Sequence, residues 1–181
     1  MQSYEHYIEC ELAEYLRLIL AANSRFLENI TSSHEIPFNV KVDKYEQVRQ
    51  FEIKIDTSNI KNYETYNVKM RENVREEASR VKSLGFSYNI HNLYDLNDFL
   101  RFDLDLKLES KGFEALHANA NKEKWKKEHL IYPSDINLNL TKLNYYKAIL
   151  IFLKYVSRAS DHPYDNTTNA VYQEILNKEG I

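Results

Sequence analysis

The sequence predicts one α+β domain over residues 1–181, built on a mostly antiparallel sheet of about four strands with one apolar face covered by helices. Two kinds of hydrophobic periodicity support this class. Apolar residues recur every three or four positions near the two ends of the chain, as in helices, whereas they alternate with polar residues in four shorter segments between, as in strands. The chain has no internal repeat, low-complexity tract or linker, so a single domain is expected.

Helices are expected at both ends of the chain. A long N-terminal helix begins at the cap residue Ser3, and its apolar residues keep helical spacing as far as Phe26. The segment near 142–158 is apolar on almost all sides, which predicts a buried helix with Thr141 as its N-cap. A C-terminal helix is expected to begin at about Asn166.

Two more helices are expected in the middle of the chain. Residues 66–84 carry a modest apolar stripe at helical spacing and precede Gly85, which suits the position just after a helix. Residues 113–130, which include the lysine-rich stretch around Trp125, are also predicted to be helical.

Four segments with strict alternation are the predicted strands: 38–43 and 51–56, which would form a hairpin, then 102–109 and 135–140. Because successive side chains of a strand point to opposite faces, the sheet would have one apolar face and one polar face. Acids outnumber lysines on this polar face, so it is expected to be acidic. Its members are Asp43, Glu52, Asp56, Asp103, Asp105 and Glu109 with Lys41, Lys54 and Lys107.

The scarcity of glycine and cysteine excludes several function classes. The three glycines stand alone, so no glycine-rich loop can bring backbone N–H groups to a phosphate, and conventional nucleotide-binding enzymes are not expected. With Cys10 as the only cysteine, an intramolecular disulfide and a thiolate zinc cluster are both excluded. His6 precedes Cys10 by four residues, which allows a thiolate–imidazole pair; a small buried thiol is the competing interpretation.

A soluble, cytoplasmic protein without a membrane partner is expected. No run approaches the ~18 apolar residues that a membrane span needs, and the first residues lack the basic and apolar regions of a secretory signal. The net charge of −3 gives no general attraction to nucleic acid. Abundant Asn, Lys, Ile and Tyr with few Gly and Pro indicate an AT-rich bacterial or phage genome.

The leading hypothesis for function is a protein-binding module that uses no cofactor, such as an inhibitor, an immunity protein or an accessory subunit in a bacterial or phage conflict system. Two features favour it: the acidic polar face, which suits a basic protein partner, and fourteen tyrosines, a residue type enriched at protein interfaces. The absence of a recognised catalytic signature agrees with it.

The alternative hypothesis is a small nuclease that depends on Mg²⁺. Asp43 followed by Glu52-Ile53-Lys54 resembles the Asp…Glu-x-Lys arrangement of the PD-(D/E)xK nucleases. The resemblance implies that Asp43 and Glu52 bind the metal and that Lys54 helps to activate the attacking water. Acid-x-Lys triplets are no more frequent in this chain than its composition predicts, so a solvated sheet face with cross-strand ion pairs is the competing interpretation.

A nuclease without metal is the second form of this alternative. Arg158 and His162 resemble the Arg-x₄₋₆-His signature of HEPN ribonucleases, although only three residues separate them and Pro163 disfavours helical geometry at His162. The competing interpretation is a connection between helices, in which Arg158 and Asp161 form local caps or ion pairs.

The lysine-rich stretch at Lys122, Trp125 and Lys126 is the candidate contact to nucleic acid, because lysines neutralise phosphates and the indole offers a face for stacking a base. The competing interpretation is a solvated helix that anchors Trp125 in the core.

Overall fold

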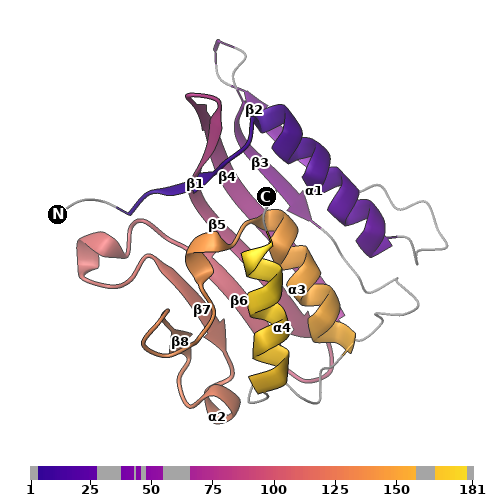
Figure 1. The fold of residues 1–181 in the computed structure, drawn as a ribbon, viewed down its shortest axis with the longest axis vertical. Coiled ribbons are helices and arrows are strands. Elements are labelled where there is room, and N and C mark those ends of the chain that lie inside the picture. The colour runs from indigo at the N-terminus through magenta and orange to yellow at the C-terminus, as the bar shows by residue number, and fades with distance from the viewer. Residues whose placement is uncertain are drawn as a thin grey trace.

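The computed structural model describes residues 4–27, 38–42, 44–45, 48–54, 66–157 and 166–178 (Figure 1). Within them the chain forms one eight-stranded sheet in the order β2-β3-β4-β5-β6-β7-β8, with β1 paired to the start of β5, and every pair is antiparallel. The predicted α+β class and antiparallel sheet are confirmed, with more strands than expected. The strands are β1 (His6–Ile8), β2 (Phe38–Val42), β3 (Val48–Lys54), β4 (Tyr66–Glu77), β5 (Arg80–Asn92), β6 (Phe99–Leu104), β7 (Leu116–Ala120) and β8 (His129–Leu130).

Three helices lie on one face of the sheet (Figure 1): α1 (Leu12–Leu27), α3 (Tyr145–Ser157) and α4 (Asn166–Asn177). α3 contacts α1, α4, β4 and β5. A single helical turn, α2 (Lys122–Trp125), connects β7 to β8. Within the described ranges, no helix combines the length and the apolar character that crossing a membrane requires.

The buried helix expected near 142–158 corresponds to α3. Its N-cap is Asn144 rather than Thr141, because the Asn144 side chain accepts a hydrogen bond from the Lys147 backbone N–H at 2.9 Å. Thr141 lies in a 3₁₀ turn just before the helix. The ring of Phe152 in α3 stacks on that of Phe102 in β6, with centroids 5.9 Å apart, so this helix forms the centre of the core.

The N-terminal helix starts later than predicted. Residues 6–8 form β1, which pairs with residues 81–83 of β5, on the same edge as β6 but before the residues that β6 pairs with. This pairing buries His6 and Ile8, and α1 begins only at Leu12.

The helix predicted over 66–84 is wrong, because these residues belong to the β4–β5 hairpin. Ala78 and Ser79 form its turn with positive φ angles of 51° and 60°, the geometry that suits two-residue hairpin loops. Two features obscured the strand alternation: the core-facing residue Glu72 of β4 is polar, and a bulge at Leu84, which the register skips between Ser83 and Gly85, shifts the pattern of β5 by one residue.

Gly85 lies at this bulge, not at the end of a helix. Its φ is +146°, and a Cβ there would lie 3.1 Å from the Leu104 carbonyl oxygen. Gly85→Ala is therefore expected to lower the free energy of unfolding by about 1–3 kcal/mol, measured by urea denaturation. Gly112 is the matched control, since its φ is +79° but no atom lies within 4 Å of a Cβ there. Gly112→Ala should cost less, and equal losses would contradict a close approach at Gly85.

Of the other segments predicted from sequence, some have the expected secondary structure and some do not. The hairpin expected at 38–43 and 51–56 exists as β2–β3, with Phe38 opposite Ile53. The helix expected over 113–130 is wrong except for α2, since residues 116–120 and 129–130 of this range form β7 and β8. The strand expected over 102–109 ends at Leu104, and no strand forms over 135–140.

The early end of β6 and the missing strand at 135–140 each have a local cause. The Asp105 carboxylate accepts the backbone N–H of Lys107 at 3.0 Å and starts a turn there. The Asp135 carboxylate accepts the backbone N–H of Ile131 at 3.2 Å and forms an ion pair with Lys127, which holds that segment as a turn.

Six tyrosines among the described residues are buried in the core. Two buried carboxylates receive hydroxyl groups: Glu72 accepts from Tyr15, and Asp98 accepts from Tyr66 and Tyr155. Burial thus accounts for six of the fourteen tyrosines, and a role of others at a protein interface stays a prediction. The buried tyrosines are Tyr15, Tyr66, Tyr88, Tyr145, Tyr155 and Tyr172.

Candidate functional site

The residues predicted for a nuclease site are only partly placed by the structure. Asp43, Arg158 and His162 lie outside the described residues. Glu52 and Lys54 are in β3, where the register puts their backbones opposite Arg71 and Lys69 of β4. The described part of the chain contains no group of three or more His, Cys, Asp or Glu side chains that could hold a metal ion. Both nuclease sites stay predictions.

The outer face of the sheet, opposite α1, α3 and α4, brings together polar side chains from neighbouring strands. Because Phe102 packs on α3, alternation turns its neighbours Arg101 and Asp103 to the outer face. The register then aligns two cross-strand rows. One row is Arg71, Ser87, Asp103 and His117, and the other is Lys69, Asn89, Arg101, Asn119 and His129.

Asp103 is the central group on this face. One of its oxygens, Oδ2, accepts hydrogen bonds from Arg101 Nε and from Asn119 Nδ2, both at 2.6 Å. The same oxygen lies 3.8 Å from His117 Nε2. The Asp103 side chain is only 13% exposed, so these contacts are partly shielded from water. Asp103 therefore fixes the arginine and supplies negative charge beside the imidazole.

Two histidines meet next to Asp103. The rings of His117 in β7 and His129 in β8 lie edge to face, with centroids 5.4 Å apart and an interplanar angle of 63°. His117 is buried and His129 is exposed. Burial lowers the pKa of His117, the charge of Asp103 acts in the opposite direction, and His129 lowers it further. His117 is therefore a neutral imidazole at pH 7, while His129 is open to solvent.

A cavity of about 710 Å³ lies over these residues. The segment Leu104–Leu108 forms part of its wall. Charged and imidazole side chains of the strands line it, beside Asp105 and Lys107 of the turn after β6, and we call the five strand residues the outer-face site. They are Arg71, Arg101, Asp103, His117 and His129.

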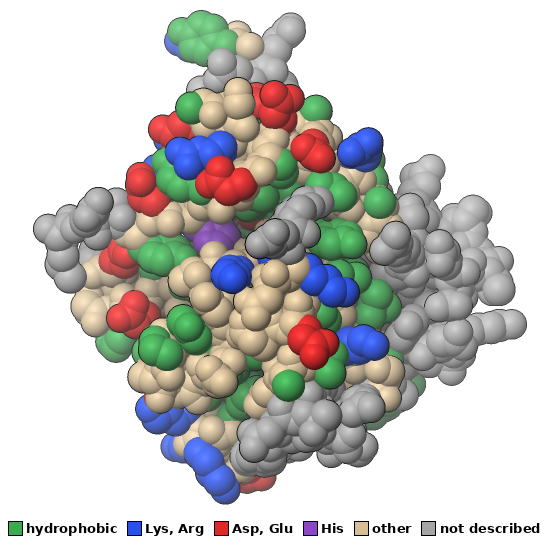
Figure 2. Space-filling view, in the orientation of Figure 1, with side chains coloured by type: hydrophobic (Ala, Val, Ile, Leu, Met, Phe, Trp, Pro, Cys, Tyr) green, Lys and Arg blue, Asp and Glu red, His purple; other side chains and the backbone are tan. Residues whose placement is uncertain are grey.

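The described part of this face is not acidic, in contrast to the expectation from sequence. The two cross-strand rows carry Lys69, Arg71 and Arg101 against Asp103. Asp105 has left the strand for the turn after β6, and Glu109 lies in a 3₁₀ turn where it accepts the backbone N–H of Tyr4 at 2.8 Å. On the helix side, acidic and basic side chains are interspersed (Figure 2).

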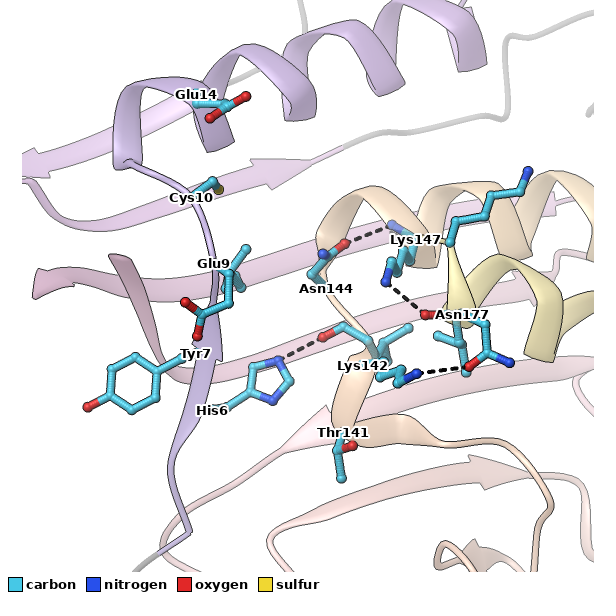
Figure 3. Close-up of a pocket in the computed structure, with 14 residues that line it drawn as sticks. His6, Tyr7, Glu9, Cys10, Glu14, Thr141, Lys142, Asn144, Lys147 and Asn177 are labelled. Carbon is cyan, nitrogen blue, oxygen red and sulfur yellow. Dashed lines mark hydrogen bonds between the residues drawn. The ribbon is translucent and has the colours of Figure 1, made fainter. Parts of the chain in front are cut away.

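A second pocket, of about 450 Å³, opens between β1, the start of α1 and the ends of α3 and α4 (Figure 3). Two of the lysines that line it hold chain ends together. The buried Lys147 Nζ donates to the Leu176 carbonyl of α4 at 2.8 Å, and Lys142 Nζ donates to Asn177 Oδ1 at 3.1 Å. These contacts dock α4 against α3, a structural role.

Cys10 and His6 line this pocket without forming a thiolate–imidazole pair. Burial raises the pKa of the Cys10 thiol to about 11, helped by the nearby Glu14 and Glu9 carboxylates, so the thiol stays protonated. His6 is engaged elsewhere, with Nε2 at 2.7 Å from the Leu143 carbonyl oxygen and Nδ1 at 3.3 Å from the Tyr4 hydroxyl.

The three residues of the lysine-rich stretch differ in their exposure to solvent. Lys122 and Lys126 are exposed, whereas Trp125 is partly buried and packs against the core. This packing agrees with the interpretation of Trp125 as an anchor. A contact of this stretch with nucleic acid stays a prediction.

Sequence reasoning missed the outer-face site because it placed His117 and His129 in a predicted helix. The signal was present in Leu116-His117-Ala118-Asn119-Ala120, where small or apolar residues alternate with polar ones as in a strand. Arg101 and Asp103 have the same period-two spacing on β6. Joining the two segments into one site required the strand order.

No protein-family model matches this chain, and comparisons with curated proteins and with solved structures give no match.

Proposed function

We propose that the outer-face site cleaves RNA by metal-independent acid–base chemistry. The observation that carries the proposal is the pair His117 and His129, one buried and neutral and the other exposed, 5.4 Å apart and lining a cavity with two arginines. Histidine is the side chain best suited to proton transfer near neutral pH, and arginine is the side chain best suited to phosphate.

RNA carries its own nucleophile, so the protein needs to supply only proton transfers and positive charge. In the proposed reaction His117 removes the proton from the 2′-hydroxyl as its oxygen attacks the adjacent phosphorus. A proton from the imidazolium form of His129 goes to the departing 5′-oxygen as the P–O bond breaks. The products are a 2′,3′-cyclic phosphate and a 5′-hydroxyl, and each histidine ends in the protonation state in which the other began.

The arginines and Asp103 have supporting roles in this proposal. Arg71 and Arg101 would stabilise the negative charge that builds up on the non-bridging phosphate oxygens. Asp103 holds Arg101 by the 2.6 Å hydrogen bond and would stabilise His117 once it has gained a proton. Asp103 is thus a positioning residue.

Cleavage of single-stranded RNA in the presence of EDTA is the test. The purified protein is expected to cut an end-labelled oligoribonucleotide and to leave a 2′,3′-cyclic phosphate, whereas the same strand with 2′-deoxyribose throughout should stay intact because it lacks the nucleophile. Mass spectrometry of the products distinguishes the cyclic phosphate from the ends that a metal-activated water would produce. Absence of cleavage, or cleavage that disappears with EDTA, would contradict the proposal.

Binding of a basic protein partner, as an inhibitor, immunity protein or accessory subunit, stays a prediction from the sequence. The outer-face arginines and the interspersed charges on the helix side do not favour it over the acid–base site.

A further inference from the structure

A third cavity, lined mostly by apolar residues, adjoins the outer-face site. It measures about 410 Å³, within the size range of sites for small organic ligands. His117 and His129 line both cavities, so they stand at the boundary between a charged compartment and an apolar one. Leu108, Phe113 and Ile131 supply most of the apolar lining.

The chain holds Phe113 at the mouth of this cavity although its side chain is 66% exposed. The 3₁₀ turn Glu109–Lys111 ends at Gly112, whose φ of +79° reverses the chain direction. The backbone N–H of Phe113 then donates to the Leu108 carbonyl at 3.1 Å. A large aromatic ring is thus kept in water by a defined turn, beside an apolar cavity.

We propose that this cavity binds a nucleobase of the RNA strand whose phosphate lies at the arginines, with Phe113 as the stacking platform; this inference rests on the proposed function. The two compartments match the two halves of a nucleotide, since the charged one suits the phosphate and the apolar one suits the flat face of the base. Their shared histidines place the boundary where the ribose and its 2′-hydroxyl would lie.

Single-stranded RNA is the substrate class that follows. A base within a duplex is stacked and paired, and it would have to leave the helix before it could enter the cavity. A free strand pays no such cost. The exposed Glu114 beside Phe113 adds no positive charge for a second phosphate, so the contact at this end is with the base.

Binding of an uncleavable strand tests the base site separately from catalysis. The probe is a fluorescein-labelled oligoribonucleotide with 2′-O-methyl groups at every position, and its dissociation constant is measured by fluorescence anisotropy. Phe113→Ala is expected to weaken binding by at least about fivefold, because stacking of a base on an aromatic ring is lost. Phe113→Tyr, which keeps a ring, should bind within about twofold of the unaltered protein.

Tyr94 provides the matched control, since it is an even more exposed aromatic residue on the β5–β6 loop and does not line the cavity. Tyr94→Ala should bind the strand as the unaltered protein does. Unchanged binding by Phe113→Ala, or equally tight binding of a duplex of the same sequence, would overturn the base site. Cleavage with unchanged binding by Phe113→Ala overturns the base site alone, whereas weakened binding by that variant without any cleavage supports the base site and overturns the catalytic proposal.

Discussion

Replacing His117 by alanine is expected to lower kcat/KM for RNA cleavage by about 10²- to 10⁴-fold, the usual contribution of a general base. His117 is the buried histidine of the pair, and burial keeps its imidazole neutral and able to accept a proton at pH 7. Initial rates with an end-labelled oligoribonucleotide in EDTA measure the effect. We expect the fold to tolerate the change because His117 lines both cavities on the face of the sheet opposite the helices, outside the core that those helices cover.

His91 is the matched control for this variant. It lies on the same face of the sheet, in β5, but does not line the cavity. His91→Ala should retain cleavage within about twofold. Equal losses in the two variants would point to a general effect on the sheet and would contradict a specific role for His117.

The pH dependence gives a second readout. Because the pKa of His117 is lowered from its usual value near 6.5, its base form is lost only as the pH falls below that value. Cleavage by the unaltered protein should therefore decline on the acid side of pH 6.5 as His117 gains a proton. In His117→Ala the residual rate should lose this limb. A residual rate with an unchanged acid limb would assign that limb to another group.

Sequence patterns predicted the fold best where a segment faces one environment along its whole length. The β2–β3 hairpin keeps strict alternation, and the segment of α3 is apolar on most sides, so both were recognised. β4 and β5 were missed because one core position of β4 holds Glu72 and a bulge at Leu84 breaks the period of β5. The apolar residues of an interrupted strand are then spaced much like those on one face of a helix.

The site was harder to predict than the fold because its members come from separate strands. Asp103 and His117 are fourteen residues apart in the sequence but directly opposite each other in the β6–β7 register. Arg71 joins the same row only through β5. No local spacing encodes such a row, since it depends on the strand order and on where each turn ends. A motif such as Glu52-x-Lys54 can be recognised in the sequence because both of its residues lie in one strand.

A buried carboxylate on the helix side of the sheet has a different consequence, for stability. Glu72 of β4 is fully buried, and it accepts hydrogen bonds from the hydroxyls of Tyr15 in α1 at 2.7 Å and Ser83 in β5 at 2.9 Å. The Tyr15 hydroxyl in turn accepts the backbone N–H of Tyr145, at the start of α3, at 3.1 Å. The Tyr88 hydroxyl lies beside the same carboxylate and helps to lower its pKa. Glu72 thereby links α1, the sheet and α3.

Burial raises the pKa of Glu72 to about 7, although the tyrosine and serine hydroxyls lower it in part. An unfolded chain would release this proton near pH 4.5, so between pH 4.5 and 7 the folded protein binds one proton more than the unfolded chain. The contribution of Glu72 to stability is therefore fully present below pH 4.5 and is lost as the pH rises to about 7. The loss is on the order of 3 kcal/mol.

Glu72→Gln is expected to remove this pH dependence, because the amide is neutral throughout and its oxygen can still accept from Tyr15. Urea denaturation at pH 5 and pH 8 measures it, and the difference between the two pH values should change by about 3 kcal/mol relative to the unaltered protein. The comparison isolates Glu72, since the buried His6 and His117, whose lowered pKa values act in the opposite direction, are common to both proteins. Glu76→Gln, at an exposed position of the same strand, is the control and should leave the difference unchanged. If Glu72→Gln kept the pH dependence of the unaltered protein, the Glu72 carboxyl would have the same pKa in the folded and unfolded chains. The hydroxyls of Tyr15 and Ser83 would then have to offset the whole effect of burial on that pKa.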